Sequence, residues 1–466
     1  MTLDSSPKTR AWIIAAMVFV LGFDLAFLWQ RRAGATASEF GAHPDEAAHY
    51  ITGLAVKNYL AHDRGTAWKK SREDFSAHYP IVQPLRRAPL FHAVEAAWMS
   101  AFGKSRTSVL LLMCFLAALV ALLLHLAVRR EFGEAAGAIA AALFLSLPLV
   151  REHTATLLPA MLGTACMLAA ALALARFLER KRAIDALLFG IAALLALFAS
   201  PVRLASLAFN RAAVPFYTAQ LAAALGVILV LITVPSLIRK LARPAERTPF
   251  WTCAAALLIG VFFFAILAPG ALDPARLLPA LPAAILFAVA GCAAIAKRFG
   301  RATGFILLLA GVLTLVLSET VMVTWRAKKW SGFQSLAGIV LESGEHPQAR
   351  ILVCSDPAGE GMFISEMAMS EPRPARTIER ADTFFANTKF TDDEALADLV
   401  GARHFDYIVF DESNPDLDHA NQHDLLRRVL RENSDRFWEM SSSPVVRDGL
   451  PQDRPARLYR VTGKTE

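Results

Sequence analysis

Two neighbouring carboxylates, Asp45 and Glu46, stand between His43 and His49 in the stretch HPDEAAHY. A positioned carboxylate can act as a general base and remove a proton from a hydroxyl group. Asp45 and His49 are four positions apart, so on a helix they could also share a metal ion. The stretch lacks the first histidine of the His-Glu-x-x-His motif, which argues against a metalloprotease zinc site.

The same stretch also fits an ordinary helix start. Proline is favoured in the first turn of a helix, and acidic residues there suit the helix dipole. On a helical wheel, small and apolar residues between Ala47 and Ala55 share one face. The acidic pair, His49 and Gly53 share the opposite face. We therefore expect the carboxylates and His49 to point into water or a cavity.

The elements that must position these residues are membrane spans. The chain has 466 residues, of which 55% are hydrophobic and only 19% are charged, less charge than a soluble domain normally carries. Runs of about 20 apolar residues predict a polytopic α-helical membrane protein. We predict nine spans, the third and fifth short enough to be tilted or re-entrant: 11–29, 107–128, 135–150, 155–178, 184–200, 216–238, 250–268, 277–296 and 302–324.

Two apolar segments have alternative interpretations. Ala11–Trp29 could be a signal peptide, but two arginines directly follow it and disfavour cleavage, so we predict an uncleaved first span. The segment Pro89–Phe102 carries His92 and Glu95. We predict that it lies at the membrane interface as an amphipathic helix instead of crossing.

The lysines and arginines of the short loops predict the orientation of the chain. With the N-terminus in the cytoplasm, four basic clusters lie inside, at 129–130, 180–182, 239–247 and 297–301. The first loop, 30–106, and the C-terminal tail then lie on the extracytoplasmic (periplasmic) side of the inner, or plasma, membrane. The basic cluster at 326–329 opposes this topology. We predict a transmembrane domain over 1–325 and a soluble extracytoplasmic domain over 326–466.

The tail has the pattern of a small α/β domain. ARILVCSD and FDYIVFDES read as buried strands, and DDEALADLV between them reads as a helix. The segment GEGMF lacks the glycine spacing of a dinucleotide-binding loop.

Other functional classes find little support in the sequence. The net charge of +7 is explained by the basic loops, and no arginine-rich aromatic patch indicates nucleic-acid binding. The five cysteines form no CxxC pair, so neither a disulfide framework nor a cysteine zinc site is predicted.

Three longer segments accompany the acidic pair. They are, in chain order, HYPIVQPLRRAPLFHAVEAAW, ALARFLERKRAIDALLFGIAALLALFASP and ARLLPALPAAILFAVAG. Together with Asp45–Glu46 and the following His49–Tyr50, their order resembles that of the GT-C glycosyltransferases. The resemblance is to the branch of protein O-mannosyltransferases and lipid A aminoarabinose transferases, and it covers roughly residues 10–325.

The resemblance implies transfer of a sugar from a polyprenyl-phosphate donor to a protein, lipid or glycan acceptor at the extracytoplasmic membrane face. Its partners would be that donor, membrane lipids and the acceptor. The implied site comprises Asp45 as general base with Glu46 as the alternate, Arg276 at the donor phosphate, and His49, Tyr50, Glu152 and His153 as substrate-binding residues. No cofactor is required by this chemistry, and a divalent cation (Mg or Mn) stays open.

Other arginines predicted on the outer side are Arg86, Arg87, Arg203 and Arg211. For the last two, interaction with lipid headgroups is the favoured interpretation.

The sequence departs from the family pattern in two places. Glu152 is the sole carboxylate of the second external loop, and Ala160 stands where the family often has Asp. Leu277 replaces a common aromatic residue. A catalytically degenerate GT-C protein is therefore one alternative, and a transport or assembly factor for surface polysaccharide is another. The few intramembrane charges and the absence of a repeat disfavour a transporter.

Overall fold

The computed structural model describes residues 7–83, 88–199, 209–268, 272–300, 311, 330–343, 348–386, 393–402, 405–413 and 420–462. The chain forms two compact units. Unit 1 comprises Met1–Arg32, Arg86–Phe91 and Leu110–Trp325, and unit 2 comprises Ala33–Leu85, His92–Val109 and Arg326–Glu466. Most of the predicted first loop thus belongs to the same unit as the C-terminal residues. The predicted domain border at residues 325 and 326 stays a prediction.

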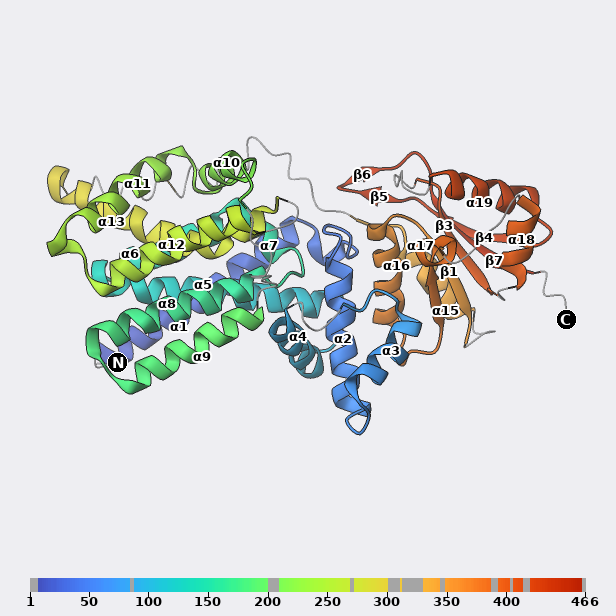
Figure 1. Ribbon diagram of the computed structural model, residues 1–466, viewed down its shortest axis with the longest axis horizontal. Helices are drawn as coiled ribbons and strands as arrows, with labels where there is room; N and C mark the ends of the chain where they lie inside the picture. Colours follow the sequence, from blue (N-terminus) through green and yellow to red (C-terminus); the bar gives the residue numbers. More distant parts are fainter. Residues whose placement is uncertain are drawn as a thin grey trace, which may run out of the picture. The chain divides into compact units, whose positions relative to one another are not determined.

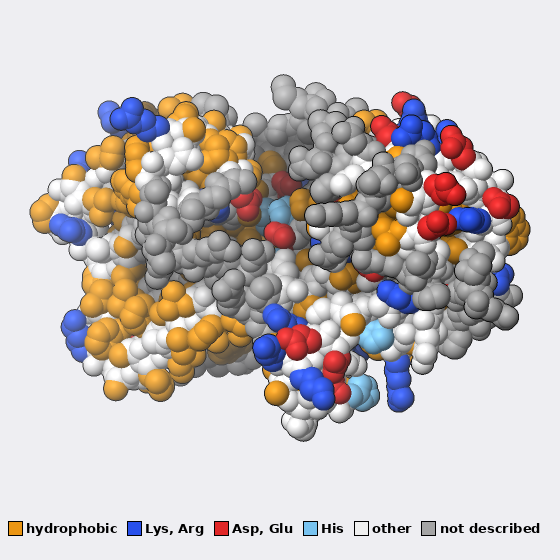
Figure 2. Space-filling view, turned by 45° about the vertical axis from the view of Figure 1, so that its right-hand side comes forward, with side chains coloured by type: hydrophobic (Ala, Val, Ile, Leu, Met, Phe, Trp, Pro, Cys, Tyr) orange, Lys and Arg blue, Asp and Glu red, His pale blue; other side chains and the backbone are white. Residues whose placement is uncertain are grey.

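Unit 1 consists of apolar helices (Figure 1). They are α1 (Pro7–Arg32), α5 (Arg106–Phe132), α6 (Glu134–Ser146), α7 (Pro148–Thr154), α8 (Ala160–Arg180), α9 (Ala183–Ala199), α10 (Ala213–Leu225), α11 (Val227–Ala242), α12 (Pro249–Leu267) and α13 (Leu281–Phe299), with the 3₁₀ helices η3 (Pro244–Glu246) and η4 (Pro274–Ala280). α8 packs against α9 and α12, and α11 packs against α13. Figure 2 shows hydrophobic side chains over much of the visible face of these helices, with lysines and arginines at their ends, as expected for helices that contact lipid.

Five of these segments are long and apolar enough to cross a membrane: α1, α5, α8, α12 and the continuous segment Pro274–Phe299. Two bent pairs, α6 with α7 and α10 with α11, raise the number to 7 if each pair is one span. α9, with 17 residues, corresponds to the predicted span 184–200 but is shorter than a full span. The predicted span 302–324 lies outside the described residues. The protein is therefore a multi-pass membrane protein, and the count of nine spans stays a prediction.

The predicted third span is broken in the structure. α6 and α7 meet at an angle of 68°. Leu147, between them, has extended backbone (φ −63°, ψ 135°) and precedes Pro148, the first residue of α7. A residue before proline is disfavoured in the helical conformation, so the sequence itself ends α6 at this point.

Unit 2 combines a helical part with an α/β part. The helical part contains η1 (Ala35–Ala37), α2 (Glu46–His62), α3 (Trp68–His78), most of α4 (Pro89–Phe102) and the first residues of α5. The α/β part contains the helices α15 (Gln334–Glu342), α16 (Pro357–Ser370), α17 (Ala381–Ala386), α18 (Asp393–Ala402) and α19 (Ala420–Glu432). Its strands are β1 (Arg350–Cys354), β2 (Thr377–Arg380), β3 (Tyr407–Asp411), β4 (Phe437–Ser443), β5 (Val446–Arg447), β6 (Leu450–Pro451) and β7 (Ala456–Val461).

The five-stranded sheet has the order β2-β1-β3-β7-β4, with β1 parallel to β2 and β3 and antiparallel pairing beyond β3. α17, α18 and α19 cover one face, where Leu352, Ile408 and Phe410 meet the apolar side chains of these helices. α16 packs against β1, and α15 packs against α16 and β4. The predicted strand, helix and strand are confirmed as β1, α18 and β3, and GEGMF lies inside α16.

A tight turn joins β5 and β6, which pair with each other. Asp448 (φ 50°) and Gly449 (φ 75°) both have left-handed backbone. Two successive positive φ angles are required by the type I′ turn of a two-residue hairpin, and Asp-Gly is a favoured sequence for it.

Candidate functional site

Asp45 is exposed at the N-cap position of α2. Its Oδ1 accepts a hydrogen bond of 3.2 Å from the Gln83 side-chain amide. Its backbone N–H donates to His43 Nδ1 at 3.1 Å, and its side chain does not cap the helix. The carboxylate is thus held from one side by Gln83 and is open to an incoming group.

The helix begins one residue later than the sequence pattern suggested. Pro44 precedes the N-cap, so it lies outside the first turn. The expectation that Glu46 and His49 face water or a cavity is wrong, because Glu46 is 2% exposed and His49 is 6% exposed. The physical reason is that α2 is packed on both sides.

Two close approaches show this packing. On one side Ala47 lies against Gly361 of α16, where an added Cβ would come within 2.9 Å of the Ala47 Cβ. On the other side Gly53 lies against Glu95 of α4, where an added Cβ would come within 2.3 Å of Glu95 Oε2. Glycine is required at both positions for helices to approach this closely.

A buried cluster of titratable groups lies behind the acidic pair. The His49 and His92 rings are 5.2 Å apart at an interplanar angle of 32°. His92 Nδ1 is 3.6 Å from Glu95 Oε2, and both side chains are fully buried. Burial raises the pKa of Glu95 well above its usual value, since the carboxylate loses its hydration. Glu95 is therefore held in its neutral, protonated form.

Replacing Glu95 with Gln is expected to remove a pH dependence from the stability of the protein. The wild-type carboxyl is protonated in both states below pH 4.5 and only in the folded state above it, so its contribution is lost as pH rises toward the raised pKa. E95Q should therefore gain on wild type between pH 5 and pH 8, by up to about 1.4 kcal/mol per pH unit. Thermal unfolding in detergent at several pH values measures the gain. The exposed Glu73→Gln is the control, and a pH-independent difference for E95Q would contradict a neutral Glu95.

Tyr50, a predicted substrate-binding residue, is fully buried. Its hydroxyl donates a hydrogen bond of 2.8 Å to the main-chain oxygen of Lys104. Burial, and next to it the charge of Glu95, raise the pKa of Tyr50 well above its usual value. In this structure His49 and Tyr50 can affect a substrate only through the position they give to the start of α2. Their roles in binding stay predictions.

The segment before the acidic stretch is tied to the α/β part of the same unit. The backbone N–H of Glu39 donates to the Trp330 oxygen at 2.7 Å. The Glu39 carboxylate accepts hydrogen bonds from the backbone N–H groups of Gly332, Phe333 and Gln334 at the start of α15. Burial raises the pKa of Glu39 to about 7, against the opposing effect of these donors. This anchoring fixes the chain six residues before Asp45.

Glu152 and His153 lie on α7 in unit 1. Glu152 is exposed, whereas His153 is buried and its Nδ1 lies 2.9 Å from the Leu149 oxygen. The Arg151 guanidinium stacks on the Trp29 ring at 3.9 Å. This cation–π contact ties the short helix to the end of α1, so the exposed Glu152 carboxylate is carried on a held element.

Arg276 lies in η4, also in unit 1. The turn is capped by Asp273, whose carboxylate accepts a hydrogen bond of 2.8 Å from the Ala275 N–H. Half-buried Arg276 donates through Nη1 to the Ala268 oxygen at 2.9 Å. Arg211 is exposed. The other arginines considered from the sequence, Arg86, Arg87 and Arg203, lie outside the described residues.

The predicted site residues thus divide between the units. Asp45, Glu46, His49 and Tyr50 come together in unit 2, and Glu152, His153 and Arg276 belong to unit 1. Within the described ranges, no group of three or more His, Cys, Asp or Glu side chains is placed to hold a metal ion.

Sequence reasoning missed three neighbours of the acidic pair. Gln83 gave no signal beyond its place before the proline- and arginine-rich end of the loop. His92 and Glu95 were noticed only as polar interruptions of an apolar segment. A polar pair three positions apart on an apolar helix could have indicated a shared buried position.

Comparison with known proteins supports a common architecture. Residues 86–238, about a third of the chain, match the family model described as Dolichyl-phosphate-mannose-protein mannosyltransferase. The chain is also similar to the crystal structure of ArnT from Cupriavidus metallidurans in the apo state, with 13% identity, a TM-score of 0.54 and coverage of 95% of this chain and 98% of that chain. For the same protein bound to undecaprenyl phosphate, the identity is 13%, the TM-score is 0.50 and the coverage is 94% and 97%.

The chain has the GT-C fold. The resemblance found in the sequence is thereby confirmed at the level of the fold. The GT-C similarity extends over nearly the whole length of both chains, so it includes the α/β part after the last predicted span. No curated protein sequence matches the chain.

Proposed function

We propose that this protein transfers a glycosyl group from a polyprenyl-phosphate-linked donor to an acceptor at the extracytoplasmic face of the inner membrane. The N-terminus lies in the cytoplasm, and the residues of unit 2 lie outside. The acceptor is a protein, a lipid or a glycan with a free hydroxyl group.

The observation that carries this proposal is the exposed Asp45 carboxylate at the start of α2 in a chain with the GT-C fold. Two further findings support it. The matched family model describes a mannosyltransferase that uses dolichyl-phosphate-mannose, and one of the similar ArnT structures is bound to undecaprenyl phosphate. Both descriptions involve a polyprenyl-phosphate carrier.

The chemistry follows from what the side chains offer. The acceptor oxygen attacks the anomeric carbon, its proton passes to the Asp45 carboxylate, and the bond from that carbon to the phosphate oxygen breaks. Polyprenyl phosphate leaves with the bonding electrons. Asp45 suits the role of general base better than Glu46, because Glu46 is buried and an acceptor cannot reach it.

The leaving phosphate needs a cation, and Arg276 is the proposed one. Removing it in Arg276→Ala is expected to raise the KM for the donor about 10- to 100-fold, since hydrogen bonds to charged groups contribute about 1.5–3 kcal/mol. Arg276→Lys should recover only part of this loss, because lysine cannot form the bidentate contact.

The exposed Arg211 provides the matched control for this measurement. Steady-state kinetics with a purified polyprenyl-phosphate sugar should show Arg211→Ala close to wild type. An unchanged donor KM in Arg276→Ala, with the protein folded, would remove Arg276 from the site.

The acceptor can be found without guessing the sugar. Deleting the protein from its host should remove a defined glycosyl mass from one class of envelope glycolipid or glycoprotein, and restoring the wild-type gene should return it. Restoration by a gene carrying Asp45→Asn would count against catalysis by Asp45.

A catalytically degenerate GT-C protein is the alternative, and one observation favours it. Ala160, the first residue of α8, stands where related sequences often carry Asp. Glu152, exposed on α7, is the proposed substitute. If Glu152→Gln leaves transfer unchanged, the second carboxylate is dispensable in this protein.

A further inference from the structure

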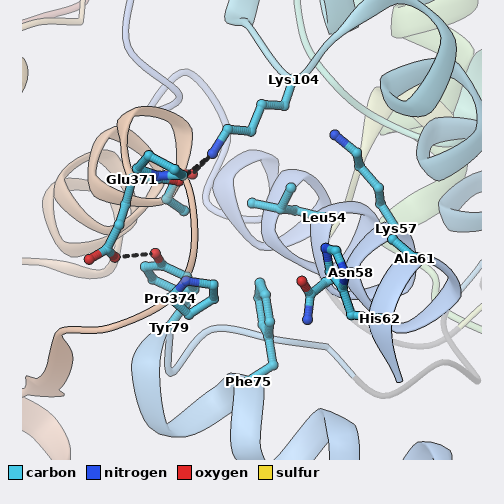
Figure 3. Close-up of a pocket in the computed structure, with 12 residues that line it drawn as sticks. Leu54, Lys57, Asn58, Ala61, His62, Phe75, Tyr79, Lys104, Glu371 and Pro374 are labelled. Carbon is cyan, nitrogen blue, oxygen red and sulfur yellow. Dashed lines mark hydrogen bonds between the residues drawn. The ribbon is translucent and has the colours of Figure 1, made fainter. Parts of the chain in front are cut away.

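A pocket of about 100 Å³ lies within unit 2, and the proposed transfer chemistry uses none of its residues. Its walls come from α2, α3, Lys104 and the chain at the end of α16 (Figure 3). A single water needs roughly 10–15 Å³ on a comparable measure, so the pocket has room for several waters or a small chemical group.

Two lysines reach this pocket from different elements. Lys57 extends from α2, and Lys104 precedes α5 (Figure 3). The Lys104 ammonium donates hydrogen bonds to the main-chain oxygens of Ala368 and Glu371. An ammonium has three donors, so one N–H of Lys104 remains for a ligand. The side chain of Lys57 makes no hydrogen bond or ion pair within the described part of the chain.

The positive charge of the pocket is not balanced by its own carboxylate. Glu371 accepts a hydrogen bond of 2.6 Å from the Tyr79 hydroxyl and pairs with Arg376 at 3.0 Å. The Glu371 charge is thus matched by Arg376, and the charges of Lys57 and Lys104 are left in excess. Burial, and next to it the charge of Lys57, lower the pKa of Lys104, with a smaller opposing effect from Glu371. An anion between the two ammonium groups would relieve this repulsion.

The rest of the lining is apolar or neutral and polar. Leu54, Phe75 and Pro374 give apolar surface, and Asn58 and His62 offer an amide and an imidazole (Figure 3). An apolar wall with a few polar groups and a cation is typical of a small-molecule site. A sugar ring has an apolar C–H face and hydroxyl edges, so it fits both kinds of surface.

We propose that this pocket binds a sugar unit that carries an oxyanion, either a phosphate or a carboxylate, and that this unit belongs to the acceptor. Lys57 and Lys104 bind the oxyanion, and the ring lies against Phe75 and Leu54. The assignment to the acceptor rests on the proposed transferase function. The binding itself does not.

Titration of the full-length protein in detergent tests the binding. The probes are glucose 6-phosphate, glucuronate, uncharged glucose and inorganic phosphate, followed by ligand-observed NMR. We expect one of the two anionic sugars to bind and glucose not to bind, and which one binds identifies the oxyanion. Lys57→Gln should weaken that binding about tenfold or more, the scale of a lost charge-assisted contact. Lys57→Glu should abolish it.

The control is Lys69→Gln on α3, because Lys69 is exposed, pairs with Glu73 and does not line the pocket. It should bind like wild type. Failure of both anionic sugars to bind wild type, or equal binding to wild type and Lys57→Glu, would overturn the proposal. Inorganic phosphate binding as tightly as the sugar phosphate would overturn its sugar component.

Transfer kinetics separate this proposal from the proposed function. In an active preparation, Lys57→Gln should raise the KM for an anionic acceptor and leave the KM for the donor unchanged. Unchanged acceptor kinetics would show that the pocket serves no acceptor, although the protein is a transferase. Sugar binding in a protein without transfer activity would leave the pocket standing and refute the transferase.

Discussion

Replacing Asp45 with Asn is expected to lower the rate of sugar transfer by about 10²–10⁴-fold, the usual contribution of a general base. Asparagine has nearly the same shape and can keep a hydrogen bond with the Gln83 side chain, which now lies 3.2 Å from Asp45 Oδ1. It cannot accept the proton of the acceptor hydroxyl. Expression, folding and donor binding should therefore stay at wild-type levels while turnover falls.

The measurement is the initial rate of release of polyprenyl phosphate with purified protein in detergent or nanodiscs. Asp74→Asn on α3 changes an exposed carboxylate of the same unit and should have no effect. If Asp45→Asn retains full turnover, another group removes the proton. Glu46→Gln then identifies whether the neighbouring carboxylate does so.

Replacing Gly53 with Ala is expected to destabilise unit 2 by roughly 1–3 kcal/mol, the usual cost of overpacking. The added Cβ would lie 2.3 Å from Glu95 Oε2 and 2.4 Å from Glu95 Cδ, so α2 and α4 would have to separate. Ala in place of Gly normally favours a helix by about 0.5–1 kcal/mol, and the clash must outweigh that gain. Because α2 carries Asp45 at its N-cap, transfer activity should fall as well.

A double-mutant cycle isolates the cause. Glu95→Ala removes the group in the way, so Gly53→Ala should cost little or nothing in that background, with a coupling energy of about 0.5–3 kcal/mol. Gly338→Ala in α15 is the control, because nothing lies within 4 Å of its added Cβ. Equal costs of Gly53→Ala with and without the Glu95 side chain would show that the two helices do not meet as described.

Part of the fold could be predicted because its signals are local. β1 and β3 are short, almost entirely apolar runs, as parallel strands buried on both faces require. β2 is four residues, Thr377–Arg380, with a single apolar side chain, and takes its conformation from pairing with β1. No local pattern announces such a strand. The break at Leu147 is local again, and the following proline predicts it.

The site was harder to predict because its environment comes from distant parts of the chain. A helical wheel shows the faces of one helix but not how many neighbours pack against it, so the burial of Glu46 and His49 was missed. Gly53 was the available signal, since a glycine inside a helix often marks a close approach. That Glu95 fills this space depends on the packing of α4 against α2, which no sequence period encodes.

The most direct test of the central claim is a single reaction with two measured products. The wild-type protein, a panel of polyprenyl-phosphate sugars and an envelope extract as acceptor are incubated together, and free polyprenyl phosphate and glycosylated acceptor are quantified by mass spectrometry. We predict that one donor yields both products in equal amounts with wild type and neither with Asp45→Asn. Absence of both products for every donor, or equal yields from wild type and Asp45→Asn, would contradict a polyprenyl-phosphate glycosyltransferase that uses Asp45 as its base.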